Sequence, residues 1–88
     1  MVTAYPAPRH LISHNDWARL RSALLSMEEI TITRSLGDLT VVVWTARVSK
    51  VWPVAAVVGI MTTRPGKMVR KYTESVEAAQ AALERWRA

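Results

Sequence analysis

"ITITRSLGDLTVVVWTARV", residues 30–48, has the pattern of two β-strands joined by a tight turn. Ile30 and Ile32 alternate with polar residues, as in a strand that buries one side. Gly37 and Asp38 follow, and a Gly-X pair suits a two-residue hairpin turn. Residues 39–48 are then rich in β-branched residues, which is typical of a central strand. The stretch therefore predicts an antiparallel hairpin and, with it, a protein built on a sheet.

Two more strands are predicted to continue this sheet. Ser49 and Lys50 are expected to turn the chain into a third strand, "VWPVAAVVGIMTT", residues 51–63. Pro53 is tolerated near the start of this strand where its missing N–H is not needed for pairing. In "RPGK", residues 64–67, Pro precedes Gly, which favours a type II turn. A short fourth strand is predicted over residues 68–72.

A helix is predicted to precede the sheet, over residues 14–27. Ser13 can cap its first amides while Asp16, three residues later, bonds back to the cap, which is a capping box. Ile12 and Trp17 occupy the two positions of a hydrophobic staple. Apolar residues then recur at helical spacing, namely Trp17, Leu20, Leu24 and Met27.

A second helix is predicted after the sheet, capped by Thr73 or Ser75. Its apolar stripe consists of Val76, Ala79, Leu83 and Trp86. Two helices on one face of a four-stranded antiparallel sheet make a two-layer α+β sandwich, in the order α-β-β-β-β-α. The 88 residues are expected to form a single domain. Residues 1–12, which contain Pro6 and Pro8, are expected to be an irregular lead-in.

The pleat of the sheet predicts which side chains share a face, because two-residue turns give paired residues opposite parity. The face beneath the helices would collect Ile30, Ile32, Leu36, Leu39, Val41, Val43, Trp52, Val54, Val58, Ile60 and Val69. The open face would be mixed, with Thr31, Thr33, Val42, Trp44, Ala46, Ala55, Val57, Gly59, Met61, Met68, Arg70 and Tyr72. Three tryptophans on apolar stripes are expected to be buried in one core, namely Trp17, Trp52 and Trp86.

The positive charge of the chain is concentrated in one segment. The formal net charge is +5, yet residues 39–73 hold six of the twelve cations and none of the seven acidic residues, which leaves the rest of the chain at −1. Such asymmetry produces a field that attracts a polyanion or an acidic protein face. The six cations are Arg47, Lys50, Arg64, Lys67, Arg70 and Lys71.

This segment predicts a small accessory protein, of phage or bacterial type, that binds nucleic acid mainly through phosphates. The grip would be formed around the Pro-Gly turn by Arg64, Lys67, Arg70 and Lys71, and extended by Arg47 and Lys50. Single-strand binders stack bases over a cationic sheet. The open face would offer Trp44 and Tyr72 for such stacking, or for an interface, with Met61 beside them. The sequence leaves DNA and RNA as alternatives.

A protein-binding module is the alternative prediction, for example a phage-encoded inhibitor or an antitoxin-like component. In that interpretation the basic patch would meet an acidic protein face. The apolar part of the open sheet face would be covered by the partner, or by a second copy in a homodimer. Trp44 would then be an interface residue.

The motifs of an enzyme, a cofactor site and a metal site are missing. The sequence has no cysteine, no Gly-rich phosphate loop and no nucleophile–base motif, so we expect a non-enzymatic protein without a cofactor. His10 and His14 are four residues apart, but Ser13 begins the helix between them, so no metal site is expected. The first residues do not resemble a signal peptide, and the apolar runs are too short to span a membrane. A cytoplasmic location is expected, which the absence of cysteine suits.

Two stretches resemble known nucleic-acid-binding families. The order helix, antiparallel sheet, helix resembles a double-stranded-RNA-binding domain, and "SVEAAQAALERW", residues 75–86, is similar to the last helix of that family. The lysine-rich helix start of the family is replaced here by "YTESVE", residues 72–77, and its histidine-bearing loop is absent. "KYTESVEAAQAALERW", residues 71–86, is also similar to the end of the arm-binding domain of phage-type recombinases. No site residue is carried over from either family.

Overall fold

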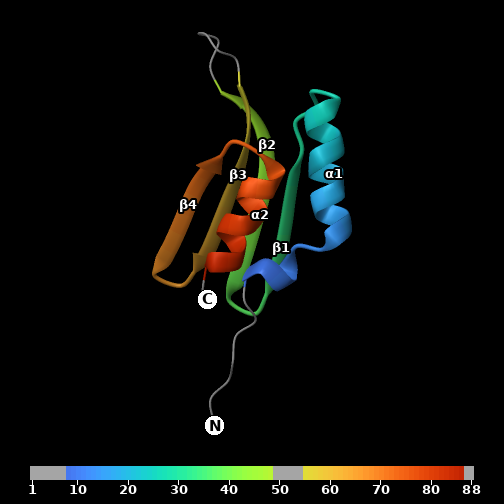
Figure 1. Ribbon diagram of the computed structural model, residues 1–88. Helices are drawn as coiled ribbons and strands as arrows, with labels where there is room; N and C mark the ends of the chain where they lie inside the picture. Colours follow the sequence, from blue (N-terminus) through green and yellow to red (C-terminus); the bar gives the residue numbers. More distant parts are fainter. Residues whose placement is uncertain (1–7, 49–54, 87–88) are drawn as a thin grey trace.

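The computed structural model describes residues 8–48 and 55–86, and within them the predicted order of elements is confirmed. Helix α1 (His14–Leu25) is followed by strands β1 (Thr31–Leu36), β2 (Leu39–Val48), β3 (Ala55–Arg64) and β4 (Lys67–Thr73), and then by helix α2 (Val76–Arg85). Both helices lie on one face of the sheet (Figure 1), so the fold is a two-layer α+β sandwich. One turn of 3-10 helix, η1 (Pro8–Leu11), occupies the end of the predicted irregular lead-in.

The sheet is an antiparallel meander with the strand order β1-β2-β3-β4. Glycines close the two described hairpins as predicted: Gly37 has a φ of 59° and Gly66 a φ of 78°, a left-handed region that glycine enters at little steric cost. The predicted turn at Ser49 and Lys50 lies outside the described residues, although β2 and β3 are paired from Val48 opposite Ala55 onward.

The predicted core face is confirmed for most of its described members, because paired residues have opposite parity in all three strand pairs. Leu36 is an exception: it is 55% exposed, since it lies at the turn end of an edge strand. Val69, on the other edge strand, is only half-buried. Trp52 and Val54 lie outside the described residues. The sheet residues buried in the core are Ile32, Leu39, Val41, Val43, Val58 and Ile60.

The helices bury most of the stripes that the sequence predicts, with differences at Trp86 and at Met27. Trp17 is 4% exposed and lies in the core together with Ile12, its staple partner. Trp86 was expected to be buried as well, but it is the residue that ends α2 and packs half-buried at the margin of the core. Apolar side chains on one stripe of α2 complete the core, namely Val76, Ala79, Ala82 and Leu83.

Helix α1 ends two residues before the predicted position. The amide of Met27 donates to the carbonyl of Leu24 (3.2 Å) and that of Glu28 to the carbonyl of Ala23 (2.8 Å), which is the Schellman pattern of a helix end. Met27 therefore adopts a φ of 59°, where glycine is usual and another residue costs about 1–2 kcal/mol. As a result Met27 is 65% exposed and leaves the apolar stripe on which it was predicted.

Helix α2 begins at one of its two predicted caps. The hydroxyl of Ser75 accepts a hydrogen bond from the amide of Ala78 (3.0 Å). Thr73, the other candidate, is buried and its hydroxyl donates to the carbonyl of Val58 (2.9 Å). Ser75 is therefore the cap, while Thr73 fastens the end of β4 to β3.

Candidate nucleic-acid interface

The β3–β4 hairpin carries four of the predicted cations, and the register shows how they are arranged. Arg64 and Lys67 are directly paired at the tip, on either side of the turn. Like charges placed opposite one another in a strand pair repel. The positive charge at the tip is therefore unfavourable for the fold, and a bound anion would reduce this repulsion.

The hairpin cations divide between the two faces of the sheet. Arg70 is paired with Met61 on the open face, whereas Lys71 is paired with Ile60, which is fully buried beneath the helices. Successive side chains of a strand point to opposite faces, so Arg70 and Lys71 project in opposite directions. The four hairpin cations that were predicted to act together are therefore divided by the pleat: Arg64, Lys67 and Lys71 lie on the helix side, and Arg70 lies on the open face.

A hollow of about 290 Å³ lies between the hairpin tip and the end of α2, and we call it the tip hollow. Arg64 and Lys67 line it from the hairpin, and Arg85 lines it from the last turn of α2. Its apolar walls include Leu39, Val69 and Trp86. No acidic residue is among the described residues that line this hollow.

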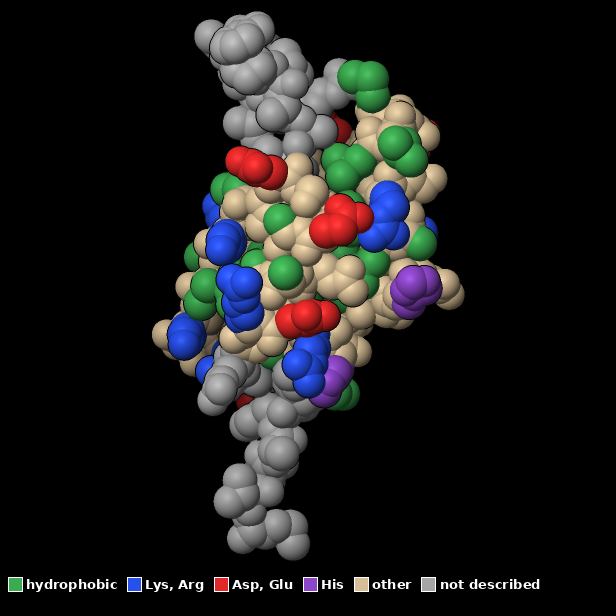
Figure 2. Space-filling view, viewed as in Figure 1, with side chains coloured by type: hydrophobic (Ala, Val, Ile, Leu, Met, Phe, Trp, Pro, Cys, Tyr) green, Lys and Arg blue, Asp and Glu red, His purple; other side chains and the backbone are tan. Residues whose placement is uncertain are grey.

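A second hollow of about 330 Å³ extends the first one along β4 and α2. Arg85 lines both hollows, and Lys71 lines the second together with Glu74. Lysine and arginine side chains gather along the β4 side of this face (Figure 2). We call the four cations Arg64, Lys67, Lys71 and Arg85 the helix-side strip.

The ion pairs within the described residues lie elsewhere. Arg21 pairs with Glu77 (3.1 Å), and the carboxylate side chain is 70% exposed. The pKa of Glu77 is lowered. The largest cause is a hydrogen bond from its own backbone amide, and the next is the hydrogen bond from Arg21. The other pair joins Arg34 and Asp16. The helix-side strip thus has no carboxylate partner among the residues that the structure describes.

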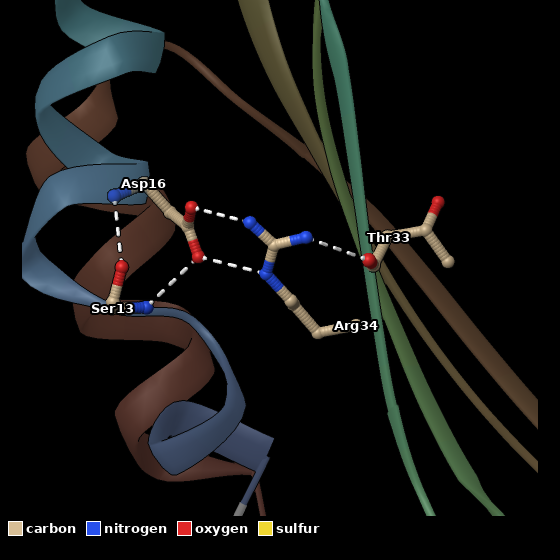
Figure 3. Close-up of polar contacts among 4 residues, drawn as sticks. All are labelled: Ser13, Asp16, Thr33 and Arg34. Atoms are coloured by element: carbon tan, nitrogen blue, oxygen red, sulfur yellow. Dashed lines mark hydrogen bonds and ion pairs between the residues drawn. The ribbon is translucent and has the colours of Figure 1, made fainter.

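The pair of Asp16 and Arg34 is a structural cluster that fastens β1 to α1 (Figure 3). Arg34 donates two hydrogen bonds to the carboxylate (2.8 and 3.2 Å) and a third to the carbonyl of Thr33 (3.2 Å). The predicted capping box is confirmed, since Ser13 and Asp16 each accept from the backbone amide of the other (3.1 Å). Burial raises the pKa of Asp16, but the hydrogen bonds from Arg34 and Ser13 and the charge of Arg34 outweigh it, so the pKa is lowered.

Trp44, Tyr72 and Arg70 share the open face, as predicted. Trp44 is paired with Gly59, and Gly59 with Tyr72, so Trp44, Gly59 and Tyr72 form one row across the sheet. The rings of Trp44 and Tyr72 meet edge to face, with centroids 5.8 Å apart and an angle of 90°. Met61 is half-buried in the next row, opposite Arg70. The proposed stacking residues therefore face away from most of the cations.

The remaining predicted cations lie at the limit of the described structure. Arg47, in β2, is paired with Ala56 of β3, but its side chain is outside the described part of the structure. Lys50 is outside it altogether.

Arg85 and Trp86 line the tip hollow but were not predicted as site residues. In the sequence, Arg85 lies in the last turn of a predicted helix, where a cation is expected because it complements the helix dipole. The sequence alone therefore offers no reason to assign it to a binding site. Only the position of α2 beside β4 brings it to the hairpin.

The described residues contain no group of three or more His, Cys, Asp or Glu that could hold a metal ion. Among the helices of the described ranges, none combines the length and the apolar character needed to cross a bilayer.

Comparisons with models of protein families, with curated proteins and with solved structures found no match.

Proposed function

We propose that this protein is a non-enzymatic accessory protein that binds nucleic acid through the phosphates of the strand. The observation that carries the proposal is the helix-side strip, in which four cations border two adjoining hollows without a carboxylate partner among the described residues. Arginine and lysine are the residues that proteins use to bind phosphate oxygens. Their unneutralised charge would attract a polyanion and release its counterions on binding.

The spacing of the strip suits a chain of phosphates better than a single anion. Lys67 and Lys71 lie on the same side of β4, four residues apart, which corresponds to about 13 Å along a strand. Several phosphates of a nucleic-acid strand fit within this length. A bound strand would therefore run along β4, between the sheet edge and α2.

A protein-binding module is the second candidate, and the open face favours it. Met68 is 60% exposed and Tyr72 54% exposed, next to the half-buried side chains of Val42, Trp44 and Met61. Contiguous apolar surface on a sheet typically marks an interface. In this function a partner or a second copy covers the open face, and the basic patch meets an acidic face of the partner.

Titration of labelled random-sequence DNA and RNA at about 50 and 200 mM salt tests the leading proposal. Binding is expected to weaken with salt, with a slope of about −0.9 per duplex phosphate contact or −0.7 per single-strand contact. The double substitution Lys67→Gln with Lys71→Gln should weaken binding and reduce the slope by about two contacts.

The matched control removes the same charge outside the strip, by Arg9→Gln with Arg19→Gln, two exposed residues on η1 and α1. This control should leave most of the slope in place. Binding that is insensitive to salt, or that falls equally in both double variants, would reject the strip as the phosphate-binding surface.

A further inference from the structure

The tip hollow differs from the second hollow in its charge, because three cations and no acidic residue are among its described lining residues, whereas Glu74 lines the second hollow. Arg64, Lys67 and Arg85 line it from three separate elements, β3, β4 and α2. The end of α2 contributes the partial negative charge of a helix C-terminus, which Arg85 offsets in the last turn. Two further cations then remain, so the hollow as a whole is positive.

The charge of the hollow matches a phosphomonoester better than an internal phosphate. A phosphodiester inside a strand carries one negative charge, whereas a phosphomonoester carries about −1.5 to −2 at pH 7. The converging cations gain more from the phosphomonoester, because Coulomb attraction grows with the charge of the anion. A terminal phosphate also fits a concave site that a continuous strand would only cross.

The walls of the hollow suit a planar ring beside the phosphate. Trp86 lines it with a half-buried indole, and Leu39 and Val69 add apolar surface. Bases stack on exposed aromatic side chains. The volume of about 290 Å³ lies just below the range for ligand pockets, about 300–1,000 Å³. One nucleotide suits this volume, but a folded length of strand does not.

We propose that the tip hollow binds a nucleoside phosphomonoester, with the phosphate on Arg64, Lys67 and Arg85 and the base against Trp86. This inference rests on the nucleic-acid binding proposed above and deepens it, because the phosphomonoester is then the phosphorylated end of a bound strand. A free mononucleotide also carries a phosphomonoester, so it is the other possible ligand of the hollow. The experiment separates the two.

Three oligonucleotides of one sequence are compared at fixed salt, carrying a 5′-phosphate, a 3′-phosphate or no terminal phosphate. One phosphorylated end is expected to strengthen binding about tenfold or more, the size of one charge-assisted hydrogen bond. Arg85→Gln should abolish this preference, whereas Arg19→Gln, which removes the same charge from the exposed part of α1, should keep it. The corresponding mononucleotide and its unphosphorylated nucleoside are titrated in parallel.

Each outcome decides between the proposals. Equal binding of the three oligonucleotides overturns the inference and leaves the proposed function standing. If no oligonucleotide binds while the mononucleotide binds and loses affinity in Arg85→Gln, the hollow is a nucleotide site and the proposed function fails. If neither the oligonucleotides nor the mononucleotide bind, both proposals fail. A preference that Arg85→Gln leaves intact assigns the terminal phosphate to another surface and also overturns the inference.

Discussion

The indole ring of Trp44 occupies the space above Gly59, its partner on the neighbouring strand. A Cβ atom added at Gly59 would collide with Cε2 and Cζ2 of the ring and lie 2.7 Å from Nε1. Tyr72 meets the same ring edge-on from the far side of the glycine. The absence of a side chain at Gly59 is therefore what allows Trp44 to lie half-buried on an otherwise open face.

We expect Gly59→Ala to destabilise the fold by about 1–3 kcal/mol, as inserted methyl groups do in well-packed sites. The cause is displacement of the Trp44 ring. In a Trp44→Ala background the same substitution should be neutral or slightly stabilising, because alanine loses less backbone entropy than glycine. Urea denaturation of the four variants gives the coupling energy directly. An equal cost of Gly59→Ala in both backgrounds would show that another contact is responsible.

Asp16→Asn should lower stability at neutral pH by about 1–2 kcal/mol, a figure reduced by the partial exposure of Arg34. The folded-state pKa of Asp16 is below its ordinary value of 3.8, so the charged form stabilises the fold. This contribution is complete above the unfolded-state pKa and is lost as the pH falls through the lower folded-state pKa. The stability difference between wild type and Asp16→Asn should therefore shrink below pH 3.8.

Glu77→Gln is the matched control for Asp16→Asn. It removes the same charge from an ion pair with arginine, but the side chain of Glu77 is 70% exposed whereas that of Asp16 is 5% exposed, and exposed pairs contribute little to stability. Thermal unfolding over a pH series would show the difference. A pH dependence that persists unchanged in Asp16→Asn would assign acid sensitivity to other carboxylates.

Local signals in the sequence were sufficient for most of the fold. The capping box requires only Ser13 and Asp16, three residues apart, and both were read correctly. Gly37 and Gly66 determine tight turns, and these turns set the parity by which core and open faces were separated. The end of α1 could not be predicted, because a positive φ at a helix end is usually signalled by glycine, and here Met27 adopts it.

The candidate site was predictable only in part, because it depends on contacts between elements distant in the sequence. Alternation along β4 already implies that Arg70 and Lys71 face opposite ways, although charge clustering alone suggests one grip. Arg85 is 21 positions from Arg64 along the chain, and the packing of α2 beside the hairpin joins them at one hollow. The bond from Arg34 to Asp16 is likewise a product of tertiary packing.

Arg70→Gln and Lys71→Gln distinguish the two faces of the sheet as binding surfaces. The residues are adjacent and carry the same charge, so a difference between the variants reports the face and not the net charge. We expect Lys71→Gln to weaken nucleic-acid binding and reduce the salt slope by about one contact, and Arg70→Gln to have a smaller effect. Fluorescence anisotropy at two salt concentrations measures both quantities. The reverse order would place the strand on the open face, against Trp44 and Tyr72.

The open face should support self-association, which Met68→Lys should weaken at least tenfold. Met68 is 60% exposed and lies on the edge strand β4, on the same face as Tyr72 and Arg70. Apolar surface of this kind gains free energy when a second copy covers it, whereas a lysine there would be buried beside Arg70 without a partner. Because Met68 contributes little to the core, the substitution should leave the melting temperature nearly unchanged.

Leu25→Lys provides the control for this association, since Leu25 is 83% exposed on α1, on the helix side of the sheet. Sedimentation velocity over a range of protein concentrations measures the dimerisation constant of each variant. We expect wild type and Leu25→Lys to dimerise alike and Met68→Lys to dimerise at least tenfold more weakly. If wild type stays monomeric throughout the range, the open face has no role in self-association. Equal loss in both variants would instead attribute association to exposed apolar residues in general.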